Sequence, residues 1–62
     1  MFPLSQIAPL IPEGKMIELV SRTNRSMFIG TAVRVIPDYY FKKLVKSVTQ
    51  LEDKIIIKLD IE

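Results

Sequence analysis

One stretch decides the fold, residues 38–51, and its sequence is DYYFKKLVKSVTQL. Wound at about 100° per residue, it places its apolar side chains within an arc of roughly 140°. These side chains are Tyr40, Phe41, Leu44, Val45, Val48 and Leu51. Pro37 and Asp38 suit a helix start, because proline needs no donor there and Asp accepts from free N–H groups. The spacing predicts an amphipathic helix over 38–51.

Three other stretches are typical of β-strands, two by their two-residue alternation and the middle one by its β-branched and aromatic residues. They cover residues 15–22, 27–36 and 54–62, and the last is the most regular. The polar loop 23–26 predicts a β-hairpin in which Asn24 adopts a left-handed conformation. A glycine inside a strand marks a bulge or a close backbone approach, and Gly30 lies inside the second strand.

These elements predict an α+β fold. Residues 1–14 form an apolar, proline-rich N-terminal arm, and residues 15–62 form a single ββαβ domain. We expect a small three-stranded antiparallel sheet with one amphipathic helix across one face, in the order arm-β-β-α-β. We expect the arm to be extended and to dock either on this sheet or on a second subunit.

An extended conformation of residues 41–49 would give a different fold, a small all-β SH3/Sm-like barrel. The segment GKMIEL (14–19) followed by FIGT (28–31) resembles the first motif of Sm-like RNA-binding proteins. In that motif a Gly-Lys opens one strand and an aromatic-x-Gly lies in the next. The Asp-Gly turn of the motif and a second motif are absent, so the resemblance assigns no functional residues.

Size and composition indicate assembly. The chain has 62 residues and is 48% hydrophobic, without cysteine. A domain this small buries only about 60% of its unfolded surface, and here no disulfide can stabilise it. Both faces of the strand at 27–36 are largely apolar, whereas one helix covers only one face of a sheet. We therefore expect a homodimer or higher oligomer.

The sequence shows no convincing catalytic grouping. The chain has no histidine, the commonest general base, and its only glycines are Gly14 and Gly30, too few for a phosphate-binding loop. The pair Glu52-Asp53 is typical of a solvated corner. We expect no enzymatic activity, no cofactor and no metal.

Basic residues form two clusters, one in the hairpin loop and one on the polar face of the predicted helix. Such clusters favour phosphate contact, with an aromatic ring available for stacking. The candidate nucleic-acid-binding residues are Arg22, Asn24, Arg25, Arg34, Tyr39, Lys42, Lys43 and Lys46.

The sequence thus favours a small basic protein that forms oligomers and binds DNA or RNA. The alternative is a protein-protein interaction or oligomerisation module that uses the apolar arm and sheet face. No apolar run approaches the roughly 18 residues of a membrane span. The N-terminal stretch also lacks the features of a signal peptide. We therefore expect a cytoplasmic protein with no membrane partner.

Overall fold

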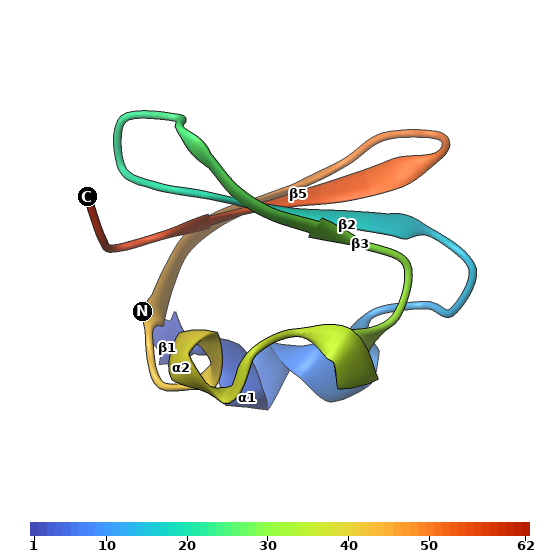
Figure 1. The fold of residues 1–62 in the computed structure, drawn as a ribbon, viewed down its shortest axis with the longest axis horizontal. Coiled ribbons are helices and arrows are strands. Elements are labelled where there is room, and N and C mark those ends of the chain that lie inside the picture. The colour runs from blue at the N-terminus through green and yellow to red at the C-terminus, as the bar shows by residue number, and fades with distance from the viewer.

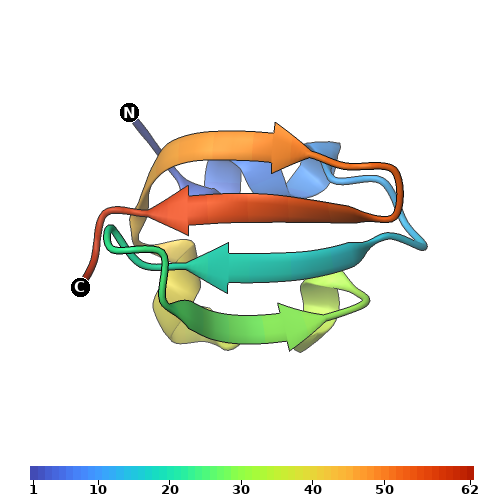
Figure 2. The same ribbon diagram turned by 90° about the horizontal axis from the view of Figure 1, so that it is seen from above.

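Two β-hairpins lie side by side in a five-stranded mixed sheet in the computed structural model, which describes all 62 residues. The strands are β1 (Phe2–Pro3), β2 (Met16–Val20), β3 (Ser26–Gly30), β4 (Leu44–Gln50) and β5 (Lys54–Leu59). Their order across the sheet is β1-β4-β5-β2-β3. The hairpins β2–β3 and β4–β5 are antiparallel, and β2 and β5 run parallel at the centre (Figure 2).

Short helical segments form a second layer beneath the sheet (Figure 1). They are α1 (Leu4–Ile7), the 3-10 turns η1 (Ala8–Leu10) and η2 (Val33–Val35), and α2 (Asp38–Phe41). Prolines bound these segments, because a proline removes an N–H donor and biases the residue before it towards extended backbone. No helix in the structure has the length and apolar character needed to cross a membrane.

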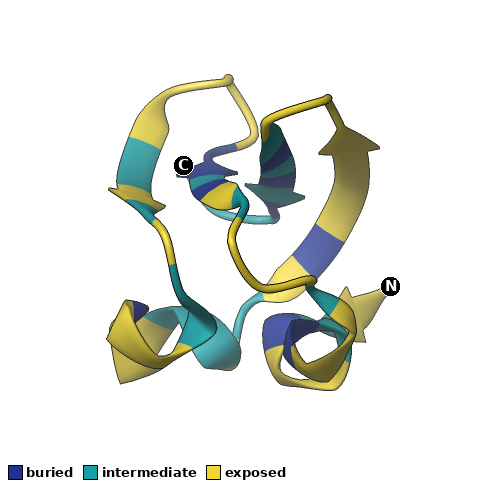
Figure 3. Cartoon of the chain, turned by 90° about the vertical axis from the view of Figure 1, so that its right-hand side faces the viewer, coloured by how far each residue is buried: buried dark blue, intermediate teal, exposed yellow.

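The core lies between the sheet and this helical layer (Figure 3). Eight apolar side chains form it: Leu4, Ile17, Leu19, Ile36, Val45, Ile55, Ile57 and Leu59. The predicted alternation of the last strand is confirmed, since Ile55, Ile57 and Leu59 are each at most 1% exposed. The two central strands therefore supply five of the eight core side chains.

The predicted three-stranded antiparallel sheet with one amphipathic helix is wrong. The helix ends at Phe41, and residues 44–50 form β4, which pairs with β5. β-Branched side chains such as Val45, Val48 and Thr49 favour strand over helix. Pairing with β5 provides backbone partners for β4, and this tertiary interaction overrides the helical spacing of the apolar residues.

The corner at Glu52-Asp53 is unsuited to the C-terminus of the helix predicted over 38–51. It provides no glycine to end a helix, and its acidic side chains are unfavourable at a helix C-terminus. In the structure it is the tight connection between β4 and β5, closed by a hydrogen bond of 2.8 Å from the Leu51 N–H to the Lys54 carbonyl oxygen.

The sheet is not the barrel of the alternative prediction either. Residues 44–50 are extended, as that alternative required, but the strand order has two ends, β1 and β3. The sheet also contains a parallel pair, β2–β5. The architecture is therefore an open mixed sheet with one covered face.

The predicted second strand ends earlier than expected, at Gly30 rather than Ile36. A Cβ atom at Gly30 would lie 2.6 Å from Cζ of Phe28, so the ring occupies the space of a side chain. The approach is by side chains rather than by the backbone that the glycine predicted. The bulge lies elsewhere, where the register of β2 and β3 shifts between Leu19 and Val20.

The N-terminal arm packs on its own chain and is partly helical rather than extended. Leu4 is fully buried in the core and Ala8 is 7% exposed. The Leu4 N–H donates to the Lys43 carbonyl oxygen at 2.8 Å, and β1 pairs with the start of β4. The arm thus covers part of the sheet of its own subunit.

Replacing Leu4 should test this role of the arm. We expect Leu4→Ala to lower the free energy of unfolding by about 2–5 kcal/mol, because it opens a cavity in the core. The matched control is Leu10→Ala, which removes an exposed leucine of the same arm and should change stability by no more than about 0.5 kcal/mol. Urea titration followed by circular dichroism measures both. Equal small effects would contradict a structural role for Leu4.

Candidate basic surface at one end of the sheet

The loop between β2 and β3 is held by a buried serine. Ser21 is 0% exposed, and its Oγ accepts hydrogen bonds from the Thr23 N–H at 3.3 Å and the Arg25 N–H at 3.1 Å. Asn24 has φ of 66°, which confirms the left-handed conformation predicted for it. Hydrogen bonds to the buried Ser21 hydroxyl therefore fix the loop backbone, while the side chains of residues 22–25 are exposed.

The C-terminal residues 60–62 connect this loop to the start of β4. The Arg22 N–H donates to the Ile61 carbonyl oxygen at 2.7 Å, and the Asp60 N–H donates to the Leu44 carbonyl oxygen at 2.8 Å. Figures 1 and 2 both place the loop, the C-terminus and α2 at the same end of the molecule. The two basic clusters predicted from the sequence therefore lie at the same end of the molecule, one at the level of the sheet and the other at the helical layer beneath it.

The Arg22 side chain, predicted from the sequence to contact phosphate, forms ion pairs with two acidic residues of its own chain. Its Nε lies 3.5 Å from Oδ1 of Asp60, and its Nη2 lies 3.9 Å from Oε1 of Glu62. The Arg22 side chain is 47% exposed, so these are surface ion pairs that contribute little to stability. They nevertheless place negative charge beside one of the predicted phosphate contacts.

Helix α2 presents an aromatic ring with a cation against it. The Lys43 Nζ lies 4.6 Å from the centre of the Tyr39 ring, a cation–π arrangement. Tyr40 packs inward, with its ring centroid 6.5 Å from that of Phe28 on β3. Tyr39 is thus exposed on a segment that Tyr40 anchors to the sheet.

Three exposed cations at this end have no acidic partner. Arg25, Lys42 and Lys46 are exposed and form no ion pair. We call this surface the basic end. It comprises seven of the eight residues predicted from the sequence, namely Arg22, Asn24, Arg25, Tyr39, Lys42, Lys43 and Lys46.

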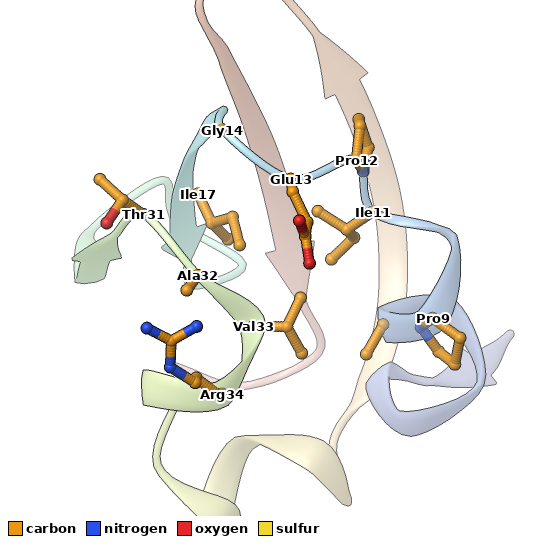
Figure 4. Close-up of a pocket in the computed structure, with 11 residues that line it drawn as sticks. Pro9, Ile11, Pro12, Glu13, Gly14, Ile17, Thr31, Ala32, Val33 and Arg34 are labelled. Carbon is orange, nitrogen blue, oxygen red and sulfur yellow. The ribbon is translucent and has the colours of Figure 1, made fainter.

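Arg34 does not belong to the basic end. It lies in η2, the yellow-green coil at the other end of Figure 1, on the wall of a 640 Å³ cavity. In Figure 4, Ile11 and Glu13 extend towards Val33 across this cavity, and Ile17 lies in its wall. The lining combines one carboxylate and one guanidinium with apolar groups.

Sequence reasoning missed several charged groups at the basic end. Lys58 lies opposite Val20, the last residue of β2 before the loop, while Asp60 and Glu62 contact Arg22. Lys58 alternates with the buried residues Ile57 and Leu59 of β5 and is only partly buried. Nothing local to residues 54–62 indicated that the end of β5 lies beside the hairpin loop, since that depends on the parallel pairing with β2.

No family model, curated protein or solved structure matches the chain. The functional argument therefore rests on the chemistry of the described residues.

The structure contains no group of three or more carboxylates that could hold a metal ion. Every buried side-chain nitrogen and oxygen has a hydrogen-bond partner. Glu52 and Asp53, the adjacent acidic pair, are exposed in the turn between β4 and β5.

Glu18 carries the one clear electrostatic perturbation, on the face of the sheet away from the helices. Hydrogen bonding by the Ser26 side chain, followed by the interaction with Lys54, lowers the pKa of Glu18 below its ordinary value of 4.5. The Lys54 Nζ lies 3.1 Å from Oε1 of Glu18, whose side chain is only 16% exposed. This pair joins the two central strands.

Replacing Ser21 should loosen the loop of the basic end. Ser21→Ala leaves the N–H groups of Thr23 and Arg25 without their acceptor, and we expect it to cost about 1–3 kcal/mol of stability. Amide exchange at Thr23 and Arg25 should accelerate. The control Ser5→Ala alters an exposed serine and should leave both quantities unchanged. Unchanged exchange in Ser21→Ala would contradict this role of the hydroxyl.

The lowered pKa of Glu18 predicts how acid affects stability. A carboxyl with a lowered folded-state pKa stabilises the fold fully above its unfolded value and loses that contribution as the pH falls through the folded value. Glu18→Gln should therefore lose less stability than the wild type between about pH 7 and about pH 3. Urea titrations at both pH values measure this difference. Glu13→Gln, which alters an exposed carboxylate without an ion pair, is the control, and an equal effect of both variants would refute the prediction.

Proposed function

We propose that this protein is a small non-enzymatic protein that binds nucleic acid, contacting phosphates through the basic end. The observation that carries the proposal is the convergence of two basic segments on residues 60–62, through the hydrogen bonds of Arg22 and Asp60. Cations gathered on one surface attract a polyanion more strongly than the same cations dispersed over the molecule.

The residues of the basic end differ in their roles. Arg25, Lys42 and Lys46 are the main phosphate contacts, because they are exposed and unpaired. Tyr39 offers an exposed ring on which a base can stack, and Lys43 adds positive charge against that ring. Arg22 contributes less, because phosphate would compete there with Asp60 and Glu62.

Phosphate contacts of this kind give little sequence preference. Their affinity depends on salt, because each neutralised phosphate releases condensed counterions. The basic end offers backbone contact and stacking, and both tolerate any base sequence. Modest sequence selectivity is therefore part of the proposal.

A protein-protein interaction module is the second candidate, and a separate observation favours it. Phe2, Gln6, Ile7 and Leu10 line a shallow hollow of 420 Å³ on the N-terminal arm. Phe2 is 62% exposed and Leu10 is 78% exposed. Exposed apolar surface of this kind often marks a binding site. Binding through it would change little with salt.

A mobility shift with DNA and with RNA, at low and at moderate salt, tests the first candidate. The double variant Arg25→Gln/Lys42→Gln should weaken binding and reduce the slope of log affinity against log salt by about 1.4–1.8 units, the value for two lost phosphate contacts. The matched control is Lys15→Gln/Arg34→Gln, which removes one lysine and one arginine outside the basic end. It should bind as the wild type does.

The possible results separate the candidates. No shift with either nucleic acid at low salt would refute nucleic-acid binding and leave the interaction module. Equal weakening by both double variants would show that net charge alone acts, which refutes a site at the basic end.

A further inference from the structure

Strand β4 has a free edge along most of its length. On one side it pairs with β5 as far as Gln50. On the other it pairs only with β1, through Phe2↔Val45 and Pro3↔Leu44. Residues 46–50 are all exposed, and on this second side of β4 no segment pairs with them (Figure 2).

The hydrogen-bond pattern shows which backbone groups this edge presents. The Leu51 N–H donates to the Lys54 carbonyl oxygen at 2.8 Å, so Leu51 and Lys54 form a hydrogen-bonded pair. In antiparallel pairing such pairs alternate with non-hydrogen-bonded ones. Thr49 therefore directs its backbone groups towards β5, whereas Val48 and Gln50 direct theirs towards the free edge.

We propose that a second copy of this chain pairs with this edge, β4 against β4, in antiparallel orientation. β1 occupies residues 44 and 45, and the turn follows at Leu51, so only residues 46–50 are available. A symmetric pairing of five residues is centred on the middle one. Val48 thus lies on the two-fold axis and exchanges both backbone hydrogen bonds with the partner's Val48.

The side chains of this register are compatible with self-pairing. Val48 meets a β-branched residue, and Ser47 lies opposite the partner's Thr49. Lys46, the extra residue of the bulge in β4, lies at the end of this register beside the partner's Gln50. A lysine on an edge strand usually discourages pairing. Here it does not face its own copy, and the amide oxygen of Gln50 can accept from its ammonium group.

Apolar surface beside the edge adds to the interface. β1 lies on this edge, and Figure 2 shows the helical segment α1–η1 beneath β4 and β5. Pairing at β4 therefore brings the exposed side chains of Phe2 and Leu10 towards the partner's helical layer. A small domain without a disulfide buries only part of its apolar surface, and Phe2 and Leu10 belong to the part that stays exposed.

The opposite edge of the sheet is less suited to the same role. In β3 the register shifts by one residue between Leu19↔Phe28 and Val20↔Ser26, leaving Met27 unpaired. Such a bulge twists an edge and interrupts pairing. Strand β4 carries a bulge as well, because its register with β5 shifts between Val45 and Ser47 and leaves Lys46 unpaired. That bulge lies beside β1, and regular pairing then runs over four residues, Ser47 to Gln50, against three, Phe28 to Gly30, in β3.

Light scattering during gel filtration, without nucleic acid, tests the proposal. We expect the wild type to be a dimer at high micromolar concentration. Val48→Lys places two ammonium groups opposite each other at the axis and should raise the dimer dissociation constant by about tenfold or more. The matched control is Ile29→Lys, which makes the same change at a 57% exposed position of β3 and should stay dimeric.

The alternative results are decisive. A monomeric wild type, or a Val48→Lys variant that dimerises as tightly as the wild type, overturns the proposal. Loss of the dimer in both variants, or in Ile29→Lys alone, also overturns the assignment to β4. Circular dichroism verifies that each variant is folded. Because no nucleic acid is present, these results are independent of the function proposed for the basic end.

Amide exchange of the wild type provides a test without any substitution. The amides of Val48 and Gln50 should gain protection as protein concentration rises, because only the dimer bonds them. The Thr49 amide should be protected at all concentrations, since it faces β5. Exchange at Val48 that does not change with concentration in a dimeric sample would overturn the proposed pairing.

Discussion

The parallel pairing of β2 with β5 is the interaction on which the rest of the structure depends. It aligns Ile17 with Ile55 and Leu19 with Ile57, and these four side chains are at most 1% exposed. Each strand also carries a hairpin partner, so one pairing joins the whole sheet. Two strands adjacent in this way need a long crossover between them. Here the crossover contains β3, η2, α2 and β4, and it places α2 below the sheet.

The same pairing organises the charged surface. It brings the end of β5 beside the loop that follows β2, so residues 60–62 can hydrogen-bond to Arg22 on one side and to Leu44 on the other. The basic residues of the loop and those after α2 then share one end of the molecule. The Glu18–Lys54 ion pair joins the same two strands on the face of the sheet that points away from the core. The arrangement of the charged residues and the packing of the core thus both depend on the parallel pairing of β2 with β5.

Several features were predictable because they depend on local chemistry. The alternation of residues 54–62 predicted the strand found at Lys54–Leu59 and its buried face, and the turn residues predicted a hairpin with Asn24 at positive φ. Residues 44–50 were not predictable in this way. Their apolar residues match a helix face, while their β-branched residues favour a strand, and the availability of β5 as a partner decides between the two. The placement of Arg34 was beyond local reasoning for the same reason, since η2 replaces the end of a predicted strand.

The sequence by itself determined the buried face of the last strand, the turn at 23–26 and the residues that carry charge. Those properties depend on side-chain chemistry and on neighbours within a few positions along the chain. Only the tertiary structure decided that residues 44–50 are extended, that β2 and β5 are parallel, and that the arm packs on its own sheet. These outcomes depend on backbone hydrogen bonds and packing between segments far apart in the sequence. Local propensities are too weak to decide among such arrangements. The free-energy difference between helix and strand that a residue's own propensity supplies is smaller than the free energy that tertiary contacts supply.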